Sequence, residues 1–166
     1  MCIQLYDMLI YQIVDTLEKR GVKYALVGGY ALALHGIVRA TMDVDFVIKL
    51  RQKDYQLAEE ALGEIGLQSR LPISAHDVIK MRKEYIKNRN LMAWSFVDYQ
   101  DPSRQADILI TLDLKDIKIK RISVAGRKIA VASLEDLLKM KLAAGRSQDI
   151  ADVDRIRGKI NEKKTR

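Results

Sequence analysis

Three aspartates, Asp43, Asp45 and Asp107, lie in apolar stretches where a negative charge needs a cation or a basic side chain beside it. The triplet Asp43-Val44-Asp45 runs into the apolar stretch 46–48, which favours a strand. Residues two apart in a strand project from the same face, so both carboxylates would point the same way. Two such carboxylates repel each other unless a cation lies between them. Mg²⁺ suits this arrangement because it takes oxygen ligands and substrate phosphates, so the triplet predicts a Mg²⁺ site, with Mn²⁺ as an alternative ion.

The third aspartate, Asp107, is the one charged residue in the apolar run 106–110. An unpaired charge in such a strand would be costly. The cost falls if this strand lies beside Asp43 and Asp45 and all three side chains share metal ions. Three carboxylates can hold two divalent ions for an in-line displacement at phosphorus. Two alternatives stay open: the triplet is an Asp-rich turn, or Asp107 pairs with an arginine.

The pair Gly28-Gly29 lies between a predicted strand at 24–27 and a short predicted helix. Two glycines let the backbone approach a phosphate, and the start of a helix offers free N–H groups. The spacing fits neither the dinucleotide-binding motif nor the Walker motif. The pair therefore predicts either a phosphate contact of another kind or a simple tight turn.

Lys141 falls within the apolar stripe of a predicted helix that begins after Ser133. The stripe consists of Leu134, Leu137, Leu138 and Leu142. A lysine at such a position must extend to solvent, pair with an acid or face a cavity. Two interpretations stay open: Lys141 contacts a nucleotide phosphate, or it forms an ion pair with Asp149 or Asp152. Arg146, just past the end of this helix, could reach the same site.

The elements that must position these residues follow from hydrophobic periodicity. Helices are predicted at about 6–17, 30–34, 55–65, 74–87, 133–144 and 149–160, and strands at 24–27, 44–48, 92–99, 106–110, 117–124 and 128–131. We expect an α/β (α+β) fold, with a mixed β-sheet and flanking helices. We also expect one domain over 1–166, whose core ends at about 132 and is followed by a short helical part over 133–166.

Composition excludes several classes of protein. A hydrophobic content of 48 % is too high for a disordered chain, and a single cysteine excludes an internal disulfide or a multi-cysteine zinc site. No apolar run is long enough to span a membrane and the N-terminus is wrong for a secretory signal, so we expect a cytoplasmic protein without a membrane partner. The net charge of +7 is concentrated in 80–90, 115–128 and 155–166, which predicts either polyanion contacts or solvated faces.

The order of these motifs resembles the nucleotidyltransferase superfamily related to DNA polymerase beta. With h for an apolar residue, the pattern of that superfamily is hG[GS], then Dh[DE]h, then h[DE]h. The matching segments are Val27-Gly28-Gly29, Asp43-Val44-Asp45-Phe46 and Ala106-Asp107-Ile108. The strings GGYALALHGIVRATMDVDFVI and SLEDLLKMKLAAGRSQDIADV are similar to one branch, the abortive-infection-type toxin nucleotidyltransferases and their small relatives. The resemblance extends from about Tyr24 to Ile156.

This resemblance implies a Mg²⁺-dependent enzyme that moves an NMP from an NTP to an acceptor hydroxyl, in a toxin–antitoxin setting. The implied catalytic and metal-binding residues, at a two-metal site, are Asp43, Asp45 and Asp107. The implied nucleotide-binding residues are Gly28, Gly29, Arg39, Thr41, Lys141 and Arg146. The implied acceptor is an RNA or a protein, with a small molecule as a further option, and the implied partner is a cognate toxin or antitoxin. The alternative is a non-catalytic nucleotide- or partner-binding module of the same fold.

Overall fold

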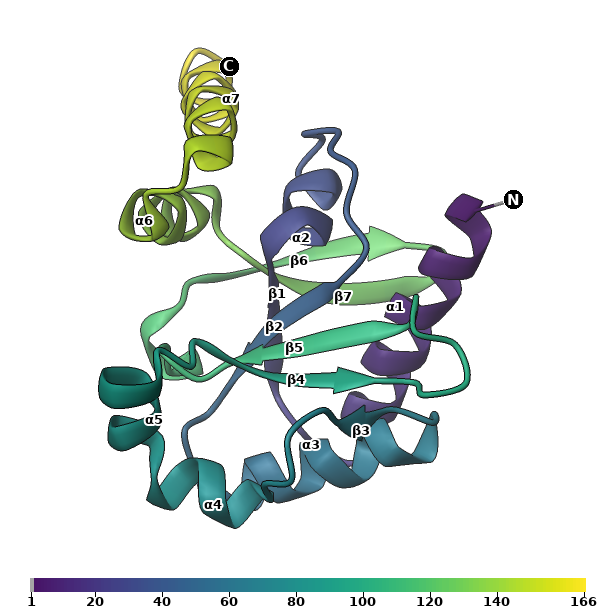
Figure 1. Cartoon of the computed structure of the whole chain (residues 1–166). Coiled ribbons are helices and arrows are strands. Elements are labelled where there is room, and N and C mark those ends of the chain that lie inside the picture. The colour runs from purple at the N-terminus through teal and green to yellow at the C-terminus, as the bar shows by residue number, and fades with distance from the viewer. Residues whose placement is uncertain (1) are drawn as a thin grey trace.

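A mixed seven-stranded sheet runs through residues 2–166, the part of the chain that the computed structural model describes; for residues 2–8 it describes the backbone alone (Figure 1). The strand order is β3-β4-β5-β2-β1-β7-β6. The strands are β1 (Tyr24–Val27), β2 (Val44–Ile48), β3 (Gln68–Ser69), β4 (Ala93–Val97), β5 (Gln105–Leu109), β6 (Ile119–Val124) and β7 (Arg127–Ala132). The pairings β2–β5 and β1–β7 are parallel and the others are antiparallel, which confirms the predicted fold class.

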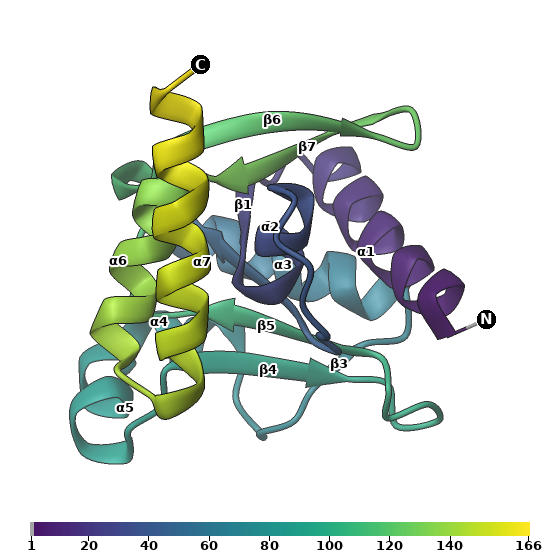
Figure 2. The same ribbon diagram turned by 90° about the horizontal axis from the view of Figure 1, so that it is seen from above.

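Helices cover this sheet in two groups. They are α1 (Cys2–Lys19), α2 (Gly28–Leu34), α3 (Gln52–Glu64), α4 (Ala75–Lys80), α5 (Arg82–Arg89), α6 (Leu134–Ala144) and α7 (Ser147–Lys164), with a 3-10 turn η1 (Leu114–Asp116). Helices α1 and α3 pack together, and Thr16 of α1 donates a hydrogen bond to the Ala61 carbonyl of α3 at 3.3 Å. Helices α6 and α7 lie side by side next to α2, as Figure 2 shows.

The core is filled by aromatic and branched side chains between the sheet and these helices. Trp94 of β4 stacks on Tyr55 of α3, with ring centroids 6.1 Å apart, and Phe96 packs against Trp94 at 4.6 Å. All three rings are at most 1 % exposed. This packing fixes α3, β4 and their neighbour β5, and β5 is the strand that carries Asp107.

The predicted helix over 74–87 is two helices. Ser74 and Asp77 form the capping box that begins α4. Helix α4 then ends at Lys80, and Met81 leaves the helical pattern before α5 begins. The cap at Ser74 indicated where the helix begins but not where it ends: Val78 of α4 is buried, whereas no residue of α5 is.

The structure also differs from the predictions in the bounds of some elements and in the exposure of one leucine. The two-residue strand β3 was not predicted, and α7 is longer than the predicted 149–160. The apolar stripe of α6 is also shorter than predicted. Leu134 and Leu137 are buried, whereas Leu142 is 52 % exposed; in the same turn the side chain of Lys141 is 12 % exposed, so the inward face of the last turn passes through Lys141. No helix in the described part of the chain is both long enough and apolar enough to cross a bilayer.

Candidate active site

Two facing carboxylates define the centre of the site. In the parallel pairing of β2 with β5, Asp45 lies opposite Asp107. Neighbouring strands are about 4.8 Å apart, so side chains at paired positions on one face are neighbours. Asp43 precedes the first residue of β2 and lines the same cavity as Asp45 and Asp107. Asp45 and Asp107 are thus neighbours, as predicted, whereas Asp43 lies in the loop before β2 and not on the predicted strand. These three residues are here called the carboxylate cluster.

The carboxylate cluster carries more negative charge than its surroundings balance. Burial raises the pKa of Asp45 to about 7, and the charges of Asp107 and Asp43 and a hydrogen bond with Asp107 add to this rise. Burial and the charge of Asp107 also raise the pKa of Asp43 above its usual range. At neutral pH such a group of acids must hold a proton or a cation.

The donor set fits a hard divalent cation only in part. Within residues 2–166 as described, no three His, Cys, Asp or Glu side chains are gathered closely enough to hold one metal ion. Asp45 and Asp107 nevertheless offer carboxylate oxygens at paired positions on adjacent strands, and the two side chains share a hydrogen bond. Carboxylate oxygens are the ligands that Mg²⁺ prefers, usually with water and substrate phosphates. Asp45 and Asp107 therefore offer two ligands of the kind that Mg²⁺ takes, and Asp43 lines the same cavity without being gathered with them into a three-carboxylate site.

Gly28 and Gly29 bring the start of α2 against this cluster. A Cβ on Gly28 would lie 3.0 Å from Cγ of Asp45 and still closer to one of its carboxylate oxygens. Gly28 also has φ of +68°, a conformation that other residues rarely adopt. A Cβ on Gly29 would lie 2.5 Å from Cβ of Thr41. Both glycines are therefore required by close packing, and both line the cavity that holds the carboxylates.

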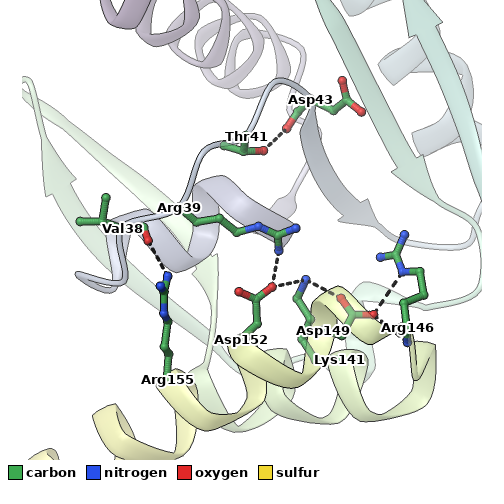
Figure 3. Close-up of polar contacts among 9 residues, drawn as sticks. All are labelled: Val38, Arg39, Thr41, Asp43, Lys141, Arg146, Asp149, Asp152 and Arg155. Carbon is green, nitrogen blue, oxygen red and sulfur yellow. Dashed lines mark hydrogen bonds and ion pairs between the residues drawn. The ribbon is translucent and has the colours of Figure 1, made fainter.

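A network of alternating charges borders the other side of the cavity (Figure 3). Lys141 Nζ lies 3.1 Å from Asp149 Oδ1 and 3.0 Å from Asp152 Oδ2. Arg39 forms an ion pair with Asp152, and Arg146 Nε lies 3.1 Å from Asp149 Oδ2. These five residues, here called the ion-pair network, join the loop before β2 to α6 and α7. The ion-pair interpretation of Lys141 is thus found in the structure, with both predicted acids as partners.

Burial makes these ion pairs structurally important. The side chains of Asp149 and Asp152 are 2 % and 6 % exposed, and that of Lys141 is 12 % exposed. Burial alone would raise the pKa of Asp149, but hydrogen bonds from Lys141 and Arg146 outweigh it and hold that pKa below its ordinary value. Lys141, Arg39 and Arg146 still line the cavity. The predicted nucleotide contact of Lys141 therefore stays a prediction that the ion pairs do not oppose.

One cavity of about 1050 Å³ gathers every predicted site residue. They are Gly28, Gly29, Arg39, Thr41, Asp43, Asp45, Asp107, Lys141 and Arg146. The cavity has a second part that lies toward β4 and β5 and carries no basic residue. Its lining was not predicted and includes Asn90, Met92, Leu109, Thr111 and Leu112. Thr111 and Leu112 follow the strand that carries Asp107, and that proximity was the one signal in the sequence that could have identified them.

A protein-family model described as "Nucleotidyl transferase AbiEii toxin, Type IV TA system" matches residues 14–159. No curated protein matches the chain significantly. Among solved structures, a putative nucleotidyltransferase from Thermotoga maritima, TM1012, superposes with a TM-score of 0.61. That protein is 18 % identical, and the match covers 96 % of this chain and 94 % of TM1012.

Two antibiotic-modifying enzymes share the fold. The lincosamide antibiotic adenylyltransferase LnuA, solved with lincomycin, is 15 % identical with a TM-score of 0.61, and the match covers 90 % of this chain and 95 % of LnuA. The antibiotic-resistance factor ANT(2'')-Ia is 11 % identical with a TM-score of 0.61, over 90 % of this chain and 80 % of that protein. At these identities the likeness establishes the fold, whereas the family match covers most of the sequence.

Proposed function

The chain belongs to the AbiEii family of nucleotidyl transferase toxins, and from that premise we propose that it transfers an NMP from an NTP to an acceptor hydroxyl in a Mg²⁺-dependent reaction. The observation that carries the proposal is the register of β2 and β5, which sets Asp45 opposite Asp107. This pair faces a cavity that is also lined by Gly28-Gly29 and by three basic side chains. Acidic and basic groups on one cavity suit a metal-bound triphosphate.

Asp45 and Asp107, with Asp43 beside them, are the residues that would hold Mg²⁺ in our proposal. Bound there, the metal would neutralise phosphate charge and lower the pKa of an acceptor hydroxyl. Asp107 accepts the hydroxyl proton. The acceptor oxygen then bonds to the α-phosphorus while the bond from that phosphorus to the pyrophosphate oxygen breaks, and pyrophosphate leaves with the electron pair. No covalent enzyme intermediate is needed, because positioning and charge neutralisation suffice.

The phosphates would lie on the basic side of the cavity. The backbone of Gly28-Gly29 and the hydroxyl of Thr41 border that side, and Arg39, Lys141 and Arg146 supply positive charge there. Three cations face two carboxylates in the ion-pair network, so the network keeps one net positive charge for an incoming triphosphate. Because α6 and α7 supply part of this site, we propose that 1–166 acts as one nucleotidyltransferase domain.

The acceptor would enter on the side of β4 and β5, next to Asp107. The family description places such enzymes in type IV toxin–antitoxin systems, which supports a toxin–antitoxin role and a macromolecular acceptor, an RNA or a protein. Small-molecule acceptors are the alternative, since LnuA is a lincosamide adenylyltransferase of the same fold. The partner implied by the family is a cognate antitoxin.

A labelling experiment tests the proposed function. The protein is incubated with each α-labelled NTP and Mg²⁺, together with total RNA, cell protein or a small-molecule pool. We expect label to enter one pool, to disappear when EDTA is added and to fall about 10²- to 10⁴-fold in Asp107→Asn. Asp116→Asn is the matched control, because Asp116 belongs to the 3-10 turn η1 and does not line the cavity.

Two outcomes would contradict the proposal. Equal labelling by Asp107→Asn and the wild type would remove Asp107 from the chemistry. Nucleotide binding by calorimetry without transfer to any pool would favour the alternative, a non-catalytic nucleotide- or partner-binding module. A loss of transfer in Asp116→Asn as well would point to an effect on folding rather than on the site.

A further inference from the structure

The loop between α2 and β2 carries much of the candidate site but little regular structure. Residues 36–43, here called the site loop, include Arg39, Thr41 and Asp43. In the described chain, the backbone of residues 38–42 makes no hydrogen bond with another backbone group. Val38, next to Arg39, is 85 % exposed. The site loop is therefore held by side-chain contacts, one of its own from Thr41 Oγ1 to the Asp43 carbonyl at 3.4 Å and others from neighbouring elements.

Two of these contacts come from α7, as Figure 3 shows. Arg155 Nη1 donates a hydrogen bond to the Val38 carbonyl oxygen at 3.0 Å. One residue further along the loop, the Arg39 guanidinium donates to Asp152. The backbone of the loop and the side chain of its arginine are thus held by residues three apart on α7, which lie on the same face of the helix.

Lys159, further along the same face of α7, lies close to the start of the site loop. Lys159 Nζ lies 3.2 Å from the position that a Cβ on Gly36 would occupy. Asp152, Arg155 and Lys159 stand at helix positions i, i+3 and i+7 and therefore form one stripe. The site loop runs along this stripe in the direction opposite to the helix. Helix α7 therefore supports the loop over most of the stretch from Gly36 to Arg39.

We propose that Arg155 is a positioning residue for nucleotide binding, acting through the Val38 carbonyl. Neither Arg155 nor Val38 lines the cavity, so neither touches a nucleotide bound there. Holding Val38 fixes the backbone next to Arg39, and through it the approach of Thr41 and Asp43 to the cluster. Asp152 also contacts Lys141, so Arg155 is the member of the stripe whose substitution changes the loop contact alone. This inference rests on the proposed function.

The test compares variants of neighbouring arginines on α7. Arg155→Met removes the donors and keeps most of the apolar stem, and Arg155→Lys restores a donor. Arg157→Met is the control, because Arg157 is exposed and its guanidinium has no partner among the residues that the structure describes. Hydrogen exchange of peptides that span 36–43 is measured first, without nucleotide. We expect exchange about threefold faster or more in Arg155→Met and wild-type exchange in Arg157→Met.

The KM for the NTP and kcat are then measured, to decide whether Arg155 acts in nucleotide binding or in the chemical step. We expect the KM for the NTP to rise about three- to tenfold in Arg155→Met, the size of one lost hydrogen bond, while kcat stays within about twofold. Arg155→Lys should recover part of this loss. Unchanged exchange together with unchanged KM would overturn the proposal, and a fall in kcat at constant KM would overturn it by assigning Arg155 to the chemistry. If the wild type transfers no nucleotide, the proposed function fails, whereas the exchange measurement still decides whether Arg155 holds the loop.

Discussion

The carboxylate cluster and the basic side chains of the ion-pair network line one cavity. Buried negative charge is uncompensated in the cluster and compensated by ion pairs in the network. In the cluster, Asp45 and Asp107 face each other without a basic partner in contact, and the pKa of Asp45 is raised to about 7. In the network, Lys141 lies within 3.1 Å of both its acids, and the pKa of Asp149 is lowered. Uncompensated charge marks the place that a cation can fill. Compensated charge instead fixes the geometry of the basic side chains around it.

The largest expected effect comes from breaking the network at its centre. Lys141→Met keeps most of the stem and removes the ammonium group, leaving Asp149 and Asp152 with less compensation in a buried position. Arg39 still pairs with Asp152 and Arg146 with Asp149, so neither acid is left without a partner. We expect the free energy of unfolding in urea at pH 7 to fall by about 1.5–3 kcal/mol, the size of a hydrogen bond to a charged group.

The matched control for this measurement is Lys139→Met on the same helix. Lys139 contacts Asp136 at 3.8 Å, but its side chain is 78 % exposed. Exposed pairs contribute little, so this variant should unfold like the wild type. If Lys141→Met were as stable as Lys139→Met, the network would not fix geometry and the contrast with the cluster would fail.

In the carboxylate cluster, removing a charge should raise the free energy of unfolding, whereas in the ion-pair network it should lower it. Asp45→Asn removes one of the repelling carboxylates and keeps a group that can donate to Asp107. We expect the metal-free protein to be stabilised by about 1–2 kcal/mol at pH 8, because the raised pKa of Asp45 means that its charge destabilises the fold. Chemical denaturation in EDTA measures this. A destabilised variant would show that Asp45 supports the fold rather than the site.

A smaller effect should appear as a pH dependence. The pKa of Asp45 is raised, so between about pH 4 and 7 the folded wild type binds a proton that the unfolded chain does not. Stability from this group is fully present near pH 4 and is lost as pH rises toward 7. The advantage of Asp45→Asn should therefore shrink as the pH falls from 8 to 4.5. Asp149 does not interfere there, because its lowered pKa acts below pH 4. A constant advantage across this range would contradict the assignment.

The sequence predicted the cluster better than the network, for a physical reason. Strand periodicity indicated both β2 and β5, and a lone carboxylate in an apolar run required a partner. These signals favoured Asp107 beside Asp45 but left an arginine partner open, and the resemblance to a known family favoured the carboxylates. Lys141 was equally conspicuous, but its partners lie on the next helix. The angle between two helices is set by tertiary packing rather than by local pattern. Both interpretations of Lys141 therefore stayed open.

The contacts between the site loop and α7 had no signal in the sequence. Val38 offers a backbone carbonyl, which every residue has, and Arg155 belonged to a basic segment that also fits a solvated face. Leu142 is the reverse case, a residue whose sequence pattern predicted burial that the structure does not show. Its spacing placed it in the apolar stripe of α6, yet it is 52 % exposed while its neighbour Lys141 faces α7 with a side chain that is 12 % exposed. Spacing indicates which face of a helix is apolar but not which residues of that face its neighbours cover.

The separation of Arg39 from Asp152 along the chain has a consequence for synthesis on the ribosome. These two partners are 113 residues apart, and every strand of the sheet is made before α7. Domains generally fold as units, so we expect the sheet and α7 to reach their final packing together, after α7 has been made. Until α7 emerges, Arg39, Lys141 and the site loop lack the acids and the arginine that hold them. The nucleotide site proposed above therefore has all of its residues and their partners only after α7 has been made.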